Sequence, residues 1–144
     1  MGKKRIIKNK GGNVSSDAKA RSMSKILKKK LADGIIHIQS TYNNTLINLT
    51  DKEGRSVTWS TSGSLGFKGA KKGTPFASSK VAEIIADKAK IMGLLEADII
   101  VNGVGAGRES AIRTFAAKGI KINMIRDITP VPHNGVRPRK PRRV

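Results

Sequence analysis

Three short segments in the first half of the chain are rich in β-branched residues and alternate between hydrophobic and polar positions: 34–42, 45–51 and 55–61. The alternation is clearest in the third segment, where Val57 and Trp59 are separated by hydroxyl-bearing residues. This two-residue period is typical of half-buried strands. Asn43-Asn44 and Gly54 mark the two connections, and both residue types favour tight turns. The pattern therefore predicts a three-stranded meander.

The hydrophobic period changes to that of a helix after residue 73. Thr74 is a good N-cap residue, and Pro75 suits the first helical position because that position needs no N–H donor. Gly93 is placed to end the helix. Between these boundaries the apolar residues recur at helical spacing: Val81, Ile84, Ile85, Ala89 and Met92.

The remaining pattern is a strand over 97–101, a helix over 107–118 and a strand over 120–128. A strand, helix, strand order predicts parallel neighbours. The continuous apolar run Ile99-Ile100-Val101 is expected at the buried centre of the sheet. The predicted fold class is α/β: the meander and the βαβ unit form one mixed five-stranded sheet, helices pack on it, and basic tails extend from both ends.

Cationic residues are concentrated at the two ends of the chain. The 144 residues include 29 Lys plus Arg against 10 Asp plus Glu, a formal net charge of +19. Residues 1–31 hold eleven cations and one anion, and residues 126–144 hold six and one, whereas the middle is nearly balanced. Such an excess indicates an anionic partner, above all nucleic acid. We expect a basic N-terminal extension (1–31), an α/β RNA-binding domain (32–130) and a basic extended tail (131–144).

The sequence offers little for a metal centre or a membrane span. It has no cysteine, and its two histidines, His37 and His133, are far apart in the chain. No apolar run approaches the ~20 residues of a membrane helix, and the basic N-terminus lacks the hydrophobic region of a signal peptide. A transit peptide fits residues 1–31 poorly, because Lys dominates there. We expect no metal, no cofactor and no membrane contact. We expect the protein in the cytoplasm or an organelle matrix.

A glycine-rich loop, residues 66–73, leads directly into the predicted helix start at Thr74. Free backbone N–H groups and the positive end of a helix therefore converge with the loop's lysines, which predicts an anion site. Gly69 and Gly73 permit close approach of the backbone to phosphate. Phe67 is either a residue that stacks on a base or a part of the core. The lysines of this loop are Lys68, Lys71 and Lys72.

A second glycine-rich loop, residues 102–108, superficially resembles a dinucleotide-binding fingerprint, with Asp127 at the end of the next strand. The fingerprint requires a third glycine where this chain has Arg108, and no further βαβ units follow to build a cofactor crevice. We interpret Gly105 and Gly107 as another helix start facing phosphate, reinforced by Arg108 and Arg113.

A nuclease is the other enzyme class to test, because Asp51, Asp98 and Asp127 all lie at predicted strand ends, where carboxylates can hold Mg²⁺. The predicted topology places Asp51 and Asp98 at one edge of the sheet and Asp127 at the other, so the three cannot share a metal. Neither histidine has an adjacent nucleophile. The sequence therefore predicts no catalysis.

The C-terminal tail is extended and basic. Pro138 and Pro141 fix φ and disfavour helix in the residues before them, so the cations project from a stiff backbone suited to RNA phosphate. Asn134-Gly135 is either a plain turn or a site of succinimide and isoaspartate formation, because glycine leaves the following amide nitrogen free to attack. The tail cations are Arg137, Arg139, Lys140, Arg142 and Arg143.

Four motifs resemble the family of small-subunit ribosomal protein eleven, over about residues 34–144: Gly66-Phe67-Lys68-Gly69, Lys72-Gly73-Thr74-Pro75-Phe76-Ala77, Gly105-Ala106-Gly107-Arg108-Glu109 and Asp127-Ile128-Thr129-Pro130-Val131-Pro132-His133-Asn134-Gly135. The last motif is the most specific. The chain departs from the family pattern at Val136, at Asn102, and at Arg139 and Pro141. These departures affect the path of the tail and one phosphate contact at Asn102, not the fold.

The resemblance implies a structural protein of the small-subunit platform that bridges rRNA helices and contributes to the cleft for the Shine–Dalgarno duplex near the exit site. It implies neighbouring ribosomal proteins seven and eighteen, nearby mRNA, no catalysis and no homo-oligomer. A free-standing nucleic-acid-binding protein is the alternative. The predicted RNA-binding residues are Lys68, Gly69, Lys71, Lys72, Gly73, Thr74, Gly105, Gly107, Arg108, Arg113, His133, Asn134, Gly135, Arg137, Arg139, Lys140, Arg142 and Arg143.

Overall fold

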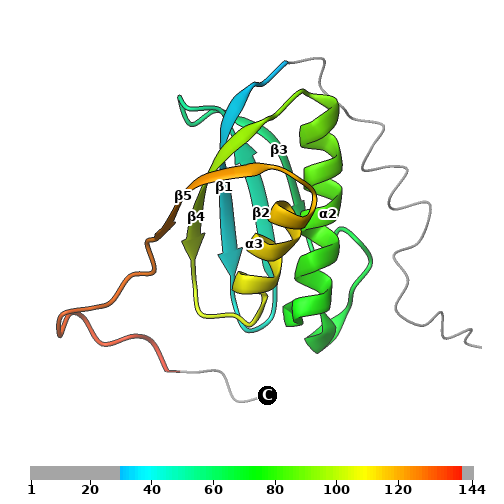
Figure 1. The fold of residues 1–144 in the computed structure, drawn as a ribbon. Helices are drawn as coiled ribbons and strands as arrows, with labels where there is room; N and C mark the ends of the chain where they lie inside the picture. Colours follow the sequence, from blue (N-terminus) through cyan, green and yellow to red (C-terminus); the bar gives the residue numbers. More distant parts are fainter. Residues whose placement is uncertain (1–29, 141–144) are drawn as a thin grey trace, which may run out of the picture.

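The computed structural model describes residues 30–140. The predicted N-terminal extension up to residue 29, and Arg142 and Arg143 of the tail, lie outside these residues. The first half forms the strands β1 (Asp33–Ser40), β2 (Thr45–Thr50) and β3 (Ser56–Thr61) (Figure 1). A short 3₁₀ helix, η1 (Gly69–Gly73), then leads into the long helix α2 (Pro75–Ile91). The second half contains β4 (Glu96–Asn102), α3 (Gly107–Ala117) and β5 (Lys121–Asp127).

The five strands form one mixed sheet in the order β3-β2-β1-β4-β5. β1 pairs antiparallel with β2, and β2 with β3, which confirms the predicted meander. β4 lies parallel to both β1 and β5, as the strand, helix, strand order predicts. The α/β fold class is therefore confirmed.

The strand register also separates the three aspartates that a nuclease would need together. Thr50 at the end of β2 and Asp98 in β4 both align with Ile35, near the start of β1. Asp127 aligns with Val101, near the opposite end of β4. Within residues 30–140 there is no group of three or more His, Cys, Asp or Glu side chains that could hold a metal ion.

Both helices pack on the same face of the sheet, and the core lies between them and that face (Figure 1). Ile36 of β1, Ile99 of β4 and Phe115 of α3 are fully buried there. Burial of each such side chain stabilises the fold by about 1.5–3 kcal/mol. The expectation that Ile100 lies at the buried centre is wrong: it faces the other side of the sheet and is only half-buried. Because the helices cover one face, alternate residues of this apolar run remain partly exposed.

Helix α2 begins and ends where the sequence predicts. The Thr74 hydroxyl oxygen accepts a hydrogen bond from the Ala77 N–H at 3.3 Å, and Pro75 occupies the first turn. At the other end Gly93 adopts φ +87, a left-handed conformation that glycine reaches without a steric penalty. The capping therefore fixes which residue starts α2, and with it the position of the glycine-rich loop that precedes the helix.

Candidate nucleic-acid interface

Three connecting segments meet at the end of the sheet where the chain leaves β1 and β4: the turn 41–44, the loop 66–74 and the loop 103–107. We call this set of residues the loop edge. Helices α2 and α3 both begin at this edge, with their N-termini side by side (Figure 1). The two glycine-rich loops that the sequence identifies as anion sites therefore belong to one surface, which their separation in the chain does not indicate.

Glycines hold the three segments of the loop edge together. A Cβ at Gly73 would overlap the carbonyl oxygen of Tyr42 and come within 2.9 Å of its carbonyl carbon. A Cβ at Gly105 would similarly overlap the carbonyl of Thr41. At Gly107 the added atom would lie 2.7 Å from the Cβ of Ser78 in α2. The turn 41–44 is thus packed between the two loops.

These contacts change the explanation for the glycines, which the sequence attributes to close approach of the backbone to phosphate. The space that a side chain would need at Gly73, Gly105 and Gly107 is occupied by other parts of the protein. The fold itself therefore requires glycine at these positions. Gly69 differs, because an added Cβ would meet nothing within 4 Å in the part of the chain that the structure describes, and its φ is +60. Among these four glycines, Gly69 is the one whose backbone is left open to a ligand.

The three lysines of the loop 66–74 lie within or directly before η1, and Lys68 and Lys71 are exposed while Lys72 is half-buried. Phe67 packs against the core and against Phe76, with ring centroids 6.1 Å apart in an edge-to-face arrangement. These contacts support the core interpretation of Phe67. The exposed aromatic side chains of this surface are Phe76 and Tyr42, which the sequence analysis missed.

The N-terminus of α2 has fewer free amides than the sequence suggests. Pro75 has no N–H, the Ala77 N–H donates to the Thr74 hydroxyl, and the Ser78 N–H donates to the Thr74 carbonyl. Helix α3 has no side-chain cap at Ala106, and Glu109 lies in its first turn. At the start of α2, lysine charge therefore contributes more to this surface than free amides do.

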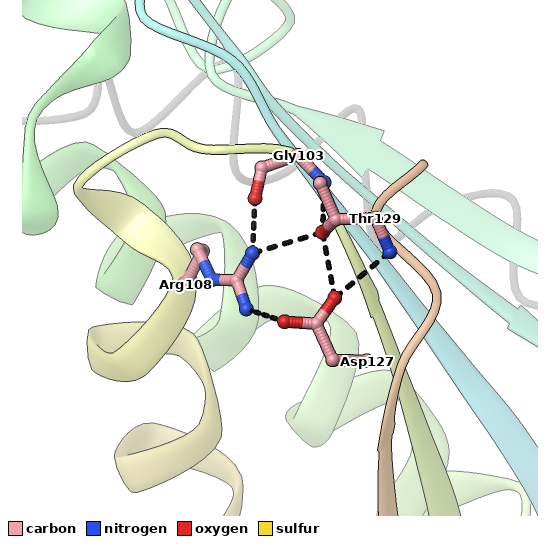
Figure 2. Close-up of polar contacts among 4 residues, drawn as sticks. All are labelled: Gly103, Arg108, Asp127 and Thr129. Carbon is pink, nitrogen blue, oxygen red and sulfur yellow. Dashed lines mark hydrogen bonds and ion pairs between the residues drawn. The ribbon is translucent and has the colours of Figure 1, made fainter. Parts of the chain in front are cut away.

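Arg108 joins α3 to the start of the C-terminal segment (Figure 2). Its guanidinium donates hydrogen bonds to the carbonyl oxygen of Gly103, to the Asp127 carboxylate, and to the Thr129 hydroxyl oxygen at 3.1 Å. The Thr129 hydroxyl in turn donates to Asp127 at 2.6 Å, and the Gly103 N–H donates to that hydroxyl oxygen at 3.1 Å. This network, which we call the Arg108 clasp, fixes the chain just after β5.

The electrostatics of the clasp favour an ionised Asp127. Hydrogen bonds from the Thr129 hydroxyl and backbone N–H, and then from Arg108, lower the pKa of Asp127 to about 2. The predicted phosphate ligand Arg108 is therefore occupied by three internal acceptors. Arg113 lies exposed on α3 and is paired with Glu109 one turn earlier. Sequence alone could not reveal the clasp, because Thr129 is 21 residues from Arg108.

The C-terminal segment, residues 128–140, has no helix or strand and runs away from the domain beside β5 (Figure 1). Asn134 adopts φ 54, the left-handed conformation typical of a turn. The predicted contact residues of this segment are all exposed: His133, Asn134, Gly135, Arg137, Arg139 and Lys140. Within residues 30–140, no helix is long and apolar enough to cross a membrane.

The loop edge and the C-terminal segment lie within a region that matches a known family. Residues 34–143 match the model of Ribosomal protein S11. The chain is 53% identical over 124 residues to "Small ribosomal subunit protein uS11c" of Guillardia theta, covering 86% of this chain and 95% of that protein. It is 48% identical over 126 residues to the uS11 protein of Solibacter usitatus (strain Ellin6076), covering 88% and 93%. The chain therefore belongs to the ribosomal protein S11 family.

Proposed function

We propose that this chain is a structural constituent of the small ribosomal subunit that binds and bridges small-subunit rRNA helices. Family membership supports its place in the small ribosomal subunit, and one structural observation supports the way in which it binds rRNA. The cationic loop before α2 and the root of the basic C-terminal segment are attached to the same rigid edge of the sheet. The protein contributes geometry and charge, and no catalytic step.

The two cationic segments differ in how firmly they are held. Lys71 and Lys72 lie in η1, whose last residue packs directly on the turn at Tyr42, so their backbone positions are fixed. The tail cations, such as Arg137, lie on an extended chain that is fixed at its root by the Arg108 clasp. A rigid cationic site and an extended arm can contact different RNA helices, and phosphate contacts of this kind position a protein without reading sequence.

The finer assignment rests on family resemblance. We place the protein on the platform of the small subunit, beside the cleft that holds the Shine–Dalgarno duplex of the mRNA near the exit site, with ribosomal proteins seven and eighteen as neighbours. The ribosome in question is that of a bacterial cytoplasm or of an organelle, since plastid-type and bacterial relatives both match.

Sedimentation tests this proposal against a free-standing nucleic-acid-binding protein. We expect the full-length chain, expressed with an affinity tag, to co-sediment stoichiometrically with small subunits and to remain bound through a high-salt wash. A general nucleic-acid-binding protein would be removed by the wash, because its affinity comes almost entirely from counterion release. Absence of the chain from washed small subunits would contradict the proposal.

Matched charge variants test the role of the loop edge. We expect replacement of Lys68, Lys71 and Lys72 by glutamine to reduce the salt slope of rRNA binding by roughly 2–3 units, at ~0.7–0.9 per phosphate contact. The control replaces three exposed lysines at the opposite edge of the sheet, Lys52, Lys90 and Lys121, and removes the same charge. Equal slopes for the two triple variants would show that the loop edge has no special role.

A further inference from the structure

A pocket of about 370 Å³ opens at the loop edge, between the ends of the parallel strands β1 and β4. This volume lies in the range of pockets that bind small organic groups. The side chains that matter for its chemistry come from the end of β1 and the turn after it, the end of β4 and the loop after it, and the start of the C-terminal segment: Gln39, Tyr42, Asn102, Val104 and Pro130. In the sequence, Asn102 stands out only as a departure from the family pattern.

The lining combines apolar surface with two amide side chains. Gln39 and Asn102 are direct neighbours in the parallel register of β1 and β4, so their amides lie beside each other at the pocket. An amide side chain offers both a donor and an acceptor, which is the combination that base edges require.

Tyr42 supplies an aromatic surface at the rim of this pocket. It is the only tyrosine of the chain, and 77% of its surface is exposed although its backbone carbonyl packs against Gly73. Base–aromatic stacking is a general mode of binding single-stranded RNA, because every base has a flat π face. The ring of Tyr42 is therefore positioned to stack on a group that enters the pocket.

The charges around the pocket indicate what kind of molecule carries that group. On one side Gly73 packs against Tyr42 and joins it to the lysines of η1. On the other side Pro130 lies in the C-terminal segment, which leads to Arg137, Arg139 and Lys140. Among the described residues, no acidic side chain lines the pocket. The pocket is therefore lined by residues that adjoin both cationic segments, the loop before α2 and the C-terminal segment.

We propose that this pocket takes one unpaired base of the RNA bound at the loop edge. The base stacks on Tyr42 and forms hydrogen bonds with the amides of Gln39 and Asn102. A base within a duplex is stacked between its neighbours and cannot enter a concave site, so the pocket selects single-stranded nucleotides in a loop, bulge or end. This inference rests on the proposed function and names the RNA feature that the loop edge recognises.

Binding of two RNA probes to the full-length protein tests the inference. The probes are single-stranded hexauridine and a blunt-ended RNA duplex with no unpaired base. We expect Tyr42→Leu to weaken binding of hexauridine by roughly 5- to 150-fold, the range for loss of one base–aromatic stack, and to leave duplex binding unchanged. Tyr42→Phe should retain binding of both probes, because the ring remains.

The matched control is Trp59→Leu. Trp59 is the chain's only tryptophan, is 60% exposed on β3, and does not line the pocket. We expect this variant to bind both probes as the wild type does. Asn102→Leu keeps the Tyr42 ring and removes one amide, and should weaken hexauridine binding alone. This second variant keeps the test decisive if Tyr42→Leu folds poorly.

Crosslinking gives an independent readout. Hexauridine that carries 5-iodouridine should crosslink to the peptide that contains Tyr42, as mapped by mass spectrometry. Equal loss of hexauridine and duplex binding in both Tyr42→Leu and Asn102→Leu, or no loss in either, would overturn the inference. Co-sedimentation with small subunits is measured separately on the wild type, so failure of the pocket and failure of the proposed function give different results.

Discussion

Gly69 and Gly73 lie four residues apart in the loop 66–74, and the structure predicts different consequences for replacing each with alanine. At Gly69 an added Cβ meets nothing within 4 Å, so the cost is the left-handed conformation alone, roughly 1–2 kcal/mol. At Gly73 the added Cβ would overlap the carbonyl group of Tyr42. Because both overlapped atoms are backbone, neither can rotate away, and we expect a cost of about 3 kcal/mol or more.

These free energies convert into melting temperatures. The described region has roughly 110 residues, and an unfolding entropy of ~2.1 cal/mol/K per residue makes 1 kcal/mol equivalent to about 4 °C. Gly69→Ala should therefore lower the melting temperature by about 4–8 °C, and Gly73→Ala by about 12 °C or more. Thermal unfolding of the full-length protein, followed by circular dichroism without RNA, measures both values.

Gly54→Ala is a matched control for Gly69→Ala. Gly54 has φ +85, its added Cβ also meets nothing within 4 Å, and it lies in the turn between β2 and β3 at the opposite edge of the sheet. The two variants should lose similar stability, and only Gly69→Ala should also weaken rRNA binding, because its backbone faces the proposed ligand. If the melting temperature of Gly73→Ala equals or exceeds that of Gly69→Ala, the packing argument is refuted. If Gly54→Ala and Gly69→Ala bind rRNA equally well, the proposed contact between the Gly69 backbone and rRNA is refuted.

Three further predictions concern charged groups. Deletion of residues 136–144 should reduce the salt slope of rRNA binding by roughly 3–5 units, since five cations are removed at ~0.7–0.9 per phosphate contact; an unchanged slope in filter binding would show that the tail is not on RNA. The pKa of Asp127 is lowered to about 2, so the clasp contributes stability that is fully present above the ordinary pKa of 3.8 and is lost as the pH falls through about 2. Asp127→Asn should therefore be less stable than the wild type in denaturant titrations at neutral pH, with a deficit that closes between about pH 4 and pH 2, and a pH-independent deficit would contradict this. Burial lowers the pKa of Lys88, which means that the folded state disfavours its charged form. Lys88→Met should therefore raise the melting temperature at neutral pH, and this gain should shrink as the pH rises toward 10.5. A gain that is the same at all pH values would exclude the charge as its cause.

Most of the fold follows from short stretches of sequence. The alternation around Val57 and Trp59 identifies a strand, and Thr74-Pro75 with Gly93 fixes both ends of α2. The one wrong expectation in the core, Ile100, arose because a continuous apolar run does not say whether helices cover one face of the sheet or both. That choice depends on how many helices the whole chain supplies and where they pack.

The candidate site was only partly predictable. The basic tail and the lysines before α2 are visible in composition, because charge needs no partner to be recognised. Tyr42 gave only a weak signal, an aromatic residue beside a turn in a chain where aromatics are 3% of residues. The Arg108 clasp and the pocket gave little, since their members are brought together by the packing of α3 and the loops at the ends of the strands.

The sequence by itself determined the elements, the charge and the family, because periodicity, capping and motifs act over a few residues. Tertiary structure decided the role of individual residues. Gly73 and Gly69 look equivalent in the chain, and only the position of Tyr42 makes one of them a packing residue. Arg108 reads as a phosphate ligand until the end of β5 places Asp127 beside it. Contacts between residues so far apart are set by how the loops and α3 pack against the ends of the strands, and no local pattern encodes them.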